Sequence, residues 1–167
     1  HHGTTRGCLR ALDRLAGQGA VMRSVIDVGC GTAVLAMGAA RIWPEDVLHS
    51  VLASDIDVVA VEVARVNVVA NGLEGRVRCL EAAGLDHPEI AAAAPFDLIF
   101  AHILKGPLID MAGDLTGRLA PGGRLILSGI LNEQADEVIE VYTKTGNSLE
   151  YRDEIGDWTT TTLVRNA

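Results

Sequence analysis

The stretch "SVIDVGCGTA", residues 24–33, joins a short apolar run to two closely spaced glycines. An apolar run of this length that ends in glycine is typical of a buried strand, and glycine lets the backbone turn sharply and approach a ligand. A dinucleotide fingerprint needs a third glycine where this chain has Val34, and the lysine of a phosphate-binding loop is also missing. The stretch therefore predicts a strand, a ligand-binding loop and a helix, and it argues against a pyrophosphate site.

Outward from this stretch, apolar runs alternate with longer segments of helical spacing, which predicts a parallel sheet covered by helices. We expect strands at 24–29, 50–55, 76–81, 96–101 and 122–129, and helices over 4–16, 33–43, 57–72, 106–119 and 132–143. Only a few residues separate 148–154 from 157–165, so these two predicted strands form an antiparallel hairpin. The fold class is therefore α/β: a three-layer, Rossmann-like sheet of about seven strands, mostly parallel, with an antiparallel C-terminal hairpin at its edge.

The valine-rich segment 57–72 has a periodicity that fits either a strand or a helix. Its length and the Asn-Gly pair at its end favour a helix. Asp57 is placed to cap that helix, and Thr4 or Thr5 to cap the first helix of the chain.

The composition indicates an aliphatic, acidic protein. With 167 residues, 49% of them hydrophobic and 4% aromatic, we expect one domain over residues 1–167, as a monomer. The net charge of -8 disfavours direct nucleic-acid binding and suits a cationic partner. Three widely spaced cysteines cannot all pair, which predicts a reduced, cytoplasmic protein. No apolar run approaches the roughly 18 residues that cross a bilayer, and the histidine spacing favours no metal site, so neither a membrane nor a metal is expected.

In a mostly parallel sheet, ligands bind outside the carboxyl ends of the strands, where the strand order reverses. The loops that follow residues 28, 54, 81 and 101 are therefore the predicted site. Asp55 lies 24 residues after Gly31, and a carboxylate there can accept hydrogen bonds from both hydroxyls of a ribose. Asp27, ahead of the glycines, suits a cationic group. Glycines with a ribose carboxylate and no phosphate site predict an adenosine-like ligand without phosphate, and S-adenosylmethionine fits.

Two longer segments carry a resemblance: "VIDVGCGTAVLAMGAA" and "DIDVVAVEVARVNVVANG" resemble the first two motifs of the class I S-adenosylmethionine-dependent methyltransferases. With them, "HHGTTRGCL", "FDLIFAHILKGPLIDMA" and "LAPGGRLILSGIL" resemble the catalytic domain of the bacterial family that methylates lysines of ribosomal large-subunit protein eleven, over essentially the whole chain. The resemblance implies S-adenosylmethionine as methyl donor, S-adenosylhomocysteine as product, and lysine side chains or the N-terminal amine of that protein as acceptors. It also implies a smaller N-terminal domain that holds the substrate, which we expect residues 1–167 to lack.

Position by position, the resemblance places cofactor contacts at Thr5, Gly29, Asp55 and the residue after the fourth strand, which is asparagine in the family and His102 here. With the residues identified above, the predicted cofactor-binding set is Thr5, Asp27, Gly29, Gly31, Asp55, Ile56 and His102. At Ala33 the family usually has a third loop glycine, and an alanine is tolerable there if the backbone φ is negative. At Lys105 the family usually has a small residue. We expect His102 to orient the amine or the cofactor, because a histidine pKa of about 6.5 is too low for a base that deprotonates lysine.

Other readings remain open at this point. His102 could be a strand-end histidine without a ligand, and with Ala33 it could mark an adenosylmethionine-binding module with weak or no catalysis. A class I methyltransferase acting on nucleic acid or a small molecule is a further alternative. Methylation of adenine typically uses two prolines and an aromatic residue after the fourth strand, and "AHIL", 101–104, has neither.

Overall fold

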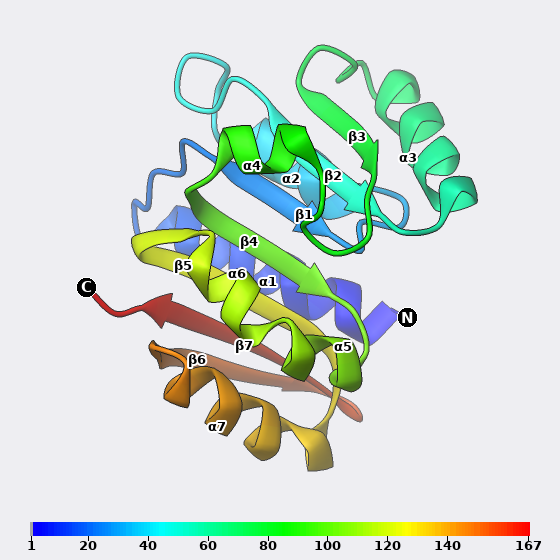
Figure 1. The fold of residues 1–167 in the computed structure, drawn as a ribbon. Coiled ribbons are helices and arrows are strands. Elements are labelled where there is room, and N and C mark those ends of the chain that lie inside the picture. Colours follow the sequence, from blue (N-terminus) through cyan, green and yellow to red (C-terminus); the bar gives the residue numbers. More distant parts are fainter. Residues whose placement is uncertain (1) are drawn as a thin grey trace.

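A seven-stranded sheet in the order β3-β2-β1-β4-β5-β7-β6 forms the middle layer of the molecule (Figure 1). The computed structural model describes residues 2–167. The strands are β1 (Val25–Val28), β2 (Val51–Asp55), β3 (Val77–Glu81), β4 (Phe96–His102), β5 (Leu119–Leu131), β6 (Asn147–Ile155) and β7 (Trp158–Arg165). The strands from β3 across to β5 are parallel to one another, whereas β7 is antiparallel to both β5 and β6. The predicted fold class is therefore confirmed, with the C-terminal hairpin at one edge.

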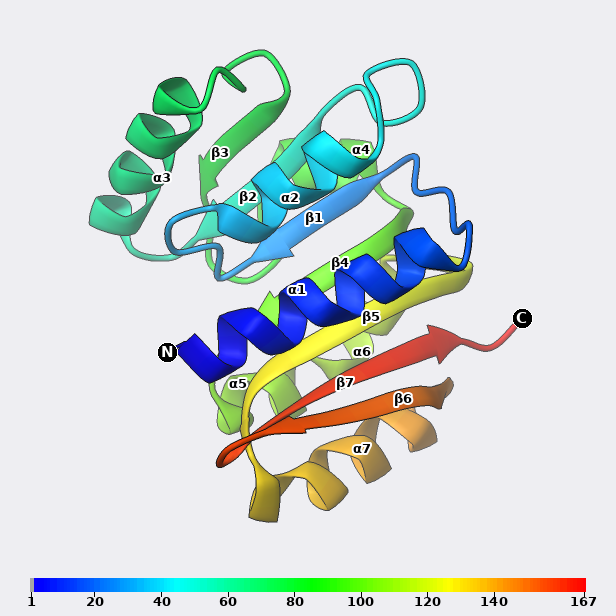
Figure 2. The ribbon, with the colours of Figure 1, turned by 180° about the vertical axis from the view of Figure 1, so that it is seen from behind.

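Helices cover both faces of this sheet. They are α1 (His2–Gly17), α2 (Val34–Ile42), α3 (Val58–Ala70), α4 (Pro88–Ala93), α5 (Lys105–Asp110), α6 (Ala112–Gly117), the 3-10 turn η1 (Asn132–Gln134) and α7 (Ala135–Lys144). Figure 1 shows α4, α5, α6 and α7 in front of the sheet, and Figure 2 shows α1, α2 and α3 on the other face. Each helical layer packs on the sheet through its own buried hydrophobic cluster, so the three layers are held by two cores. Within residues 2–167, none of the helices combines the length and apolar character needed to cross a membrane.

Three predictions for the chain between β3 and β5 are wrong. The stretch before β4 contains the unpredicted helix α4, which is only 6 residues long and begins with the His87 side chain accepting a hydrogen bond from the Glu89 N–H at 3.0 Å. The helix expected over 106–119 is two short helices that meet at Met111, in a segment weakened by three glycines. The fifth strand begins at Leu119 rather than at residue 122, and its pairing with β4 shifts register between Phe96 and Leu98.

The ambiguous segment 57–72 forms a helix, α3, as its length predicted. Asp57 caps it, with Oδ1 accepting a hydrogen bond from the Val59 N–H at 2.9 Å. Val61, Ala64 and Val68 are buried against the sheet, while the outward valines are exposed. The valines on both faces explain why the hydrophobic pattern did not distinguish a helix from a strand.

Helix α1 begins at His2, so Thr4 and Thr5 lie inside it and the predicted cap at either residue is wrong. The helix lies across β5, β7 and β6, which come from the other end of the chain (Figure 2). Arg14 donates a hydrogen bond to Thr162 Oγ1 at 2.9 Å, and Arg10 forms an ion pair with Asp153 at 3.0 Å. These contacts hold the middle and the end of α1, and in its first turn the carbonyl oxygen of Thr4 accepts a hydrogen bond from Ser128 Oγ of β5 at 3.3 Å.

Candidate functional site

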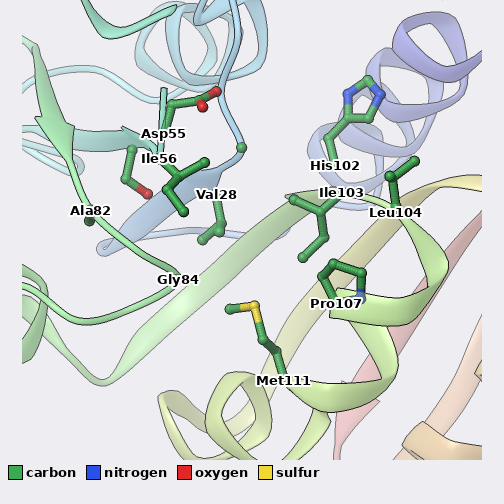
Figure 3. Close-up of a pocket in the computed structure, with 12 residues that line it drawn as sticks. Val28, Asp55, Ile56, Ala82, Gly84, His102, Ile103, Leu104, Pro107 and Met111 are labelled. Carbon is green, nitrogen blue, oxygen red and sulfur yellow. The ribbon is translucent and has the colours of Figure 1, made fainter. Parts of the chain in front are cut away.

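A cavity of about 360 Å³ opens at the carboxyl ends of the parallel strands (Figure 3). It is lined by the last residues of β1, β2 and β4, by Ala82 and Gly84 after β3, by Pro107 of α5, and by Met111 between α5 and α6. Figure 3 shows Asp55 and Ile56 on one side of the cavity and His102 on the other. These are the loops that the sequence predicts, and they meet where the strand order reverses between β1 and β4.

A second cavity, of about 340 Å³, lies beside the first. It is lined by Thr5 of α1, by the glycine loop at 29–32, by the first turn of α2 and by His102. Gly29 and His102 line both cavities, so the two spaces meet at this pair of residues. The first cavity is mainly apolar, whereas the second contains two threonine hydroxyls and the N-terminal end of a helix, where backbone N–H groups lack intrahelical partners.

The glycine loop is fixed by hydrogen bonds to the end of β2. The N–H groups of Gly29 and Cys30 both donate to the carbonyl oxygen of Ser54 at 2.9 Å. The Asp55 carboxylate, which is half-buried, accepts from the Gly31 N–H at 3.1 Å and from the Asp57 N–H at 3.0 Å. The residue predicted to hold a ribose therefore also holds the loop.

Backbone conformation explains two residues of the loop. Gly29 has a φ of +73°, and a Cβ atom there would lie 2.8 Å from the carbonyl oxygen of His102. Ala33, just before α2, has a φ of +65°, so the negative φ on which its tolerance was predicted to depend is absent. A non-glycine residue in this left-handed region costs roughly 1–2 kcal/mol, so the backbone at this position favours glycine.

Asp27 lies behind the loop rather than in it. Asp27 is fully buried and lines neither cavity. Oδ2 accepts a hydrogen bond from the Ala36 N–H at 3.2 Å, so Asp27 caps the first turn of α2, whose own N-cap residue is alanine. Burial raises the pKa of Asp27 to about 7. The structure thus separates Asp27 from the other predicted residues, which line one or both cavities.

His102 is the last residue of β4 and is half-buried. Burial lowers the pKa of its imidazole below the ordinary value, so the ring is neutral at pH 7. Lys105, three residues later, forms an ion pair with Glu137 of α7, with 2.7 Å between Nζ and Oε1. The cation is thereby turned toward α7, and the neutral ring faces both cavities.

Several lining residues were not identified individually from the sequence: Ser54, Ala82, Gly84, Pro107 and Met111. They lie on or directly after the strand ends that the sequence predicted as the site, but their residue types carry no chemical signature. Among residues 2–167, no group of three His, Cys, Asp or Glu side chains is placed to hold a metal ion.

The strand order, the glycine loop after β1 and the carboxylate at the end of β2 define a class I methyltransferase domain. The model of the ribosomal protein L11 methyltransferase (PrmA) family matches residues 1–166. The chain belongs to this family.

Individual relatives agree with this assignment. Over 147 residues, 87% of this chain, it is 46% identical to the ribosomal protein L11 methyltransferase of Bradyrhizobium diazoefficiens, covering 48% of that protein. The Brucella suis relative of the same name is 43% identical over 87% of this chain and 50% of its own length. The crystal structure of a ribosomal protein L11 methylase from Lactobacillus delbrueckii subsp. bulgaricus matches with a TM-score of 0.85 and 26% identity, over 98% of this chain and 79% of that chain. The chain spans about half the length of the curated relatives it matches.

Proposed function

We propose that this chain is the catalytic domain of an S-adenosylmethionine-dependent methyltransferase that modifies amino groups of a ribosomal large-subunit protein. The acceptors are lysine side chains or the N-terminal amine. The observation that carries the proposal is the pair of cavities that meet at Gly29 and His102. An apolar space with one carboxylate, joined to a polar space at a helix N-terminus, suits a nucleoside linked to an amino acid without phosphate. The names of the relatives support the choice of substrate.

The residues present fit the parts of this cofactor. Asp55 would accept hydrogen bonds from the ribose hydroxyls, since its two oxygens keep acceptor capacity beyond the loop N–H groups. Ile56 and Ala82 would contact the apolar faces of the purine. Thr5 and the first-turn N–H groups of α2 would bind the carboxylate of the methionine part.

When bound, the cofactor supplies a methyl group on a positively charged sulfur that is its own leaving group. The chain therefore has to exclude water and align the acceptor amine. Lysine has an ordinary pKa of about 10.4, so loss of its proton costs roughly 4–5 kcal/mol at pH 7. The neutral ring of His102 can accept a hydrogen bond from the amine and orient it. With a pKa below the ordinary histidine value, the ring is too weak a base to remove the amine proton to any large extent.

A module that binds adenosylmethionine with weak catalysis is the second candidate. It is favoured by His102 at the family's asparagine position and by the left-handed conformation of Ala33. Both candidates bind the cofactor, so a binding measurement does not separate them. The rate of methyl transfer does, because only the first candidate transfers methyl groups efficiently.

Substrate recognition is a separate part of the proposal. Residues 1–167 act as the methyltransferase domain, and a further domain, such as the N-terminal one that the family resemblance implies, holds the ribosomal protein. The net charge of -8 supports a cationic protein substrate and disfavours direct contact with nucleic acid. A cytoplasmic monomer suits this role, since ribosomal proteins are assembled in the cytoplasm.

Replacement of Asp55 by alanine tests the cofactor assignment. By calorimetry, the unmodified chain is expected to bind S-adenosylmethionine with micromolar or weaker affinity and to show no binding of NAD. Asp55→Ala removes charge-assisted hydrogen bonds to the ribose and frees the loop, so affinity should fall by about 10- to 100-fold. Asp57→Ala is the control, because it removes the cap of α3, worth about 1 kcal/mol of stability, and leaves the cavity unchanged. Preference for NAD, or no binding of either ligand, contradicts the proposal.

Replacement of His102 by asparagine tests the role of the ring. The assay follows transfer of labelled methyl groups to ribosomal protein L11, with the chain joined to the remaining part of the Bradyrhizobium diazoefficiens relative, because the chain alone is expected to methylate poorly. His102→Asn keeps a hydrogen-bond acceptor at the same place, so kcat should be preserved or rise. A collapse of kcat with unchanged cofactor affinity would show that the imidazole has a chemical role of its own.

A further inference from the structure

Four buried side-chain oxygens lack a hydrogen-bond partner among the described residues: Asp27 Oδ1, Ser54 Oγ, Asn147 Oδ1 and Thr161 Oγ1. A buried polar group without a partner is destabilising and calls for an explanation. Ser54 is the one of these four residues that lines either cavity of the site. Ser54 therefore lies in the wall of a cavity, and a ligand there could supply the missing partner once the buried hydroxyl turns toward it.

The position of Ser54 is fixed by its own main chain. Its carbonyl oxygen accepts the N–H groups of Gly29 and Cys30, each at 2.9 Å, which ties the end of β2 to the glycine loop. Its neighbours in the sheet, Val28 on β1 and Leu80 on β3, are both apolar and buried. Ser54 thus places a hydroxyl between two apolar neighbours in the wall of the first cavity, and the residue is only 1% exposed.

We propose that Ser54 Oγ is a hydrogen-bonding position for the nucleoside part of the bound cofactor. This inference rests on the proposed function. The nucleoside is the favoured partner because Ser54 lines the first cavity, with Asp55 and Ile56, and does not line the second. A serine hydroxyl is both donor and acceptor and turns about one side-chain bond, so a rotation toward the cavity presents it to a purine nitrogen or a ribose oxygen. An alanine at this position would occupy no more space than the serine and would offer no such contact.

Ser54→Ala separates this role from a structural one. Calorimetry with S-adenosylhomocysteine and with 5′-methylthioadenosine, which lacks the aminocarboxylate, should show about a three- to tenfold loss of affinity for both ligands. The unfolding midpoint of the ligand-free variant should equal or exceed that of the unmodified chain, because the substitution removes an unpartnered hydroxyl. Loss of affinity without loss of stability is the combination that a ligand-binding hydroxyl produces.

Thr161→Val is the matched control, since it also removes a buried, unpartnered hydroxyl but lies on β7 and lines neither cavity. It should leave both affinities unchanged. Unchanged affinity in Ser54→Ala would overturn the proposal, and so would a lower unfolding midpoint of the ligand-free variant. A loss for S-adenosylhomocysteine alone would overturn the assignment to the nucleoside. If the unmodified chain binds neither ligand, the proposed function itself fails, which is a result distinct from the other three.

Discussion

Replacement of Gly29 by alanine is expected to lower the free energy of unfolding by about 3 kcal/mol and to weaken binding of S-adenosylhomocysteine at least about tenfold. The new Cβ atom would lie 2.8 Å from the carbonyl oxygen of His102 and 2.8 Å from Cγ2 of Ile103. The carbonyl belongs to the strand end and cannot turn away as a flexible side chain would. The φ of +73° adds the cost of a left-handed alanine. Relief of the clash would push apart the ends of β1 and β4, which form the junction of the two cavities.

Gly72→Ala separates the clash from the backbone conformation. Gly72 has a φ of +70°, close to that of Gly29, but a Cβ atom there would meet no atom within 4 Å. Its loss of stability should therefore stay near the roughly 1–2 kcal/mol of a left-handed alanine, with ligand affinity unchanged. Chemical unfolding and calorimetry on the two variants measure both quantities. Equal losses of stability in the two variants would contradict the close approach of the strand ends.

The second large effect concerns pH. Burial raises the pKa of Asp27 from 3.8 to about 7, so the folded protein keeps a proton that the unfolded chain releases between these values. Because the folded state binds more protons in this window, the contribution of Asp27 makes the free energy of unfolding fall as pH rises from about 4 to about 7. The free energy of unfolding falls by on the order of 4 kcal/mol, because each of the roughly three pKa units between 3.8 and about 7 contributes about 1.4 kcal/mol. Above that window both states are ionised, and the contribution stays constant.

Asp27→Asn removes this contribution, because an amide has nearly the same shape, can still accept from the Ala36 N–H and does not ionise. The free energy of unfolding of the variant minus that of the unmodified chain should therefore be larger at pH 8 than at pH 4, as measured by urea unfolding at both pH values. Asp46→Asn, at an exposed position of the loop before β2, is the control and should keep the original profile. A constant difference between Asp27→Asn and the unmodified chain across this range would mean that the carboxyl group is ionised throughout.

The sequence predicted the fold well wherever one element carried a strong local signal. The apolar strands flanked by glycine, proline and asparagine were placed to within a few residues, and Asp57 was identified as a helix cap. Helix α4 was missed because 6 residues are too few to show a helical period. The break at Met111 was missed because Ala112 and Leu115 continue the apolar spacing of α5 into α6.

The candidate site was predictable where residue chemistry and sheet topology point to the same place. Asp55 and the glycine loop were identified from residue type, spacing and their place after predicted strands. The separation of Asp27 from the cavities depends on which way its side chain leaves β1, and the predicted strand did not fix that direction. Ala33 shows the same limit, since its left-handed conformation follows from how the loop meets α2. Ser54 was overlooked because a lone serine at the end of an apolar strand has no signature of its own.

Within this domain, helix α1 precedes every strand in the sequence, whereas β7 and β6, on which it docks, follow all the other strands. Its contacts join residues 124 to 148 positions apart, from Thr4 and Ser128 to Arg14 and Thr162. Such long-range contacts form late, because a large loop has to close before they can stabilise anything. Thr5 therefore reaches the second cavity only when the C-terminal hairpin is in place. During translation, the edge of this domain that carries the two cavities remains incomplete until the hairpin has left the ribosome.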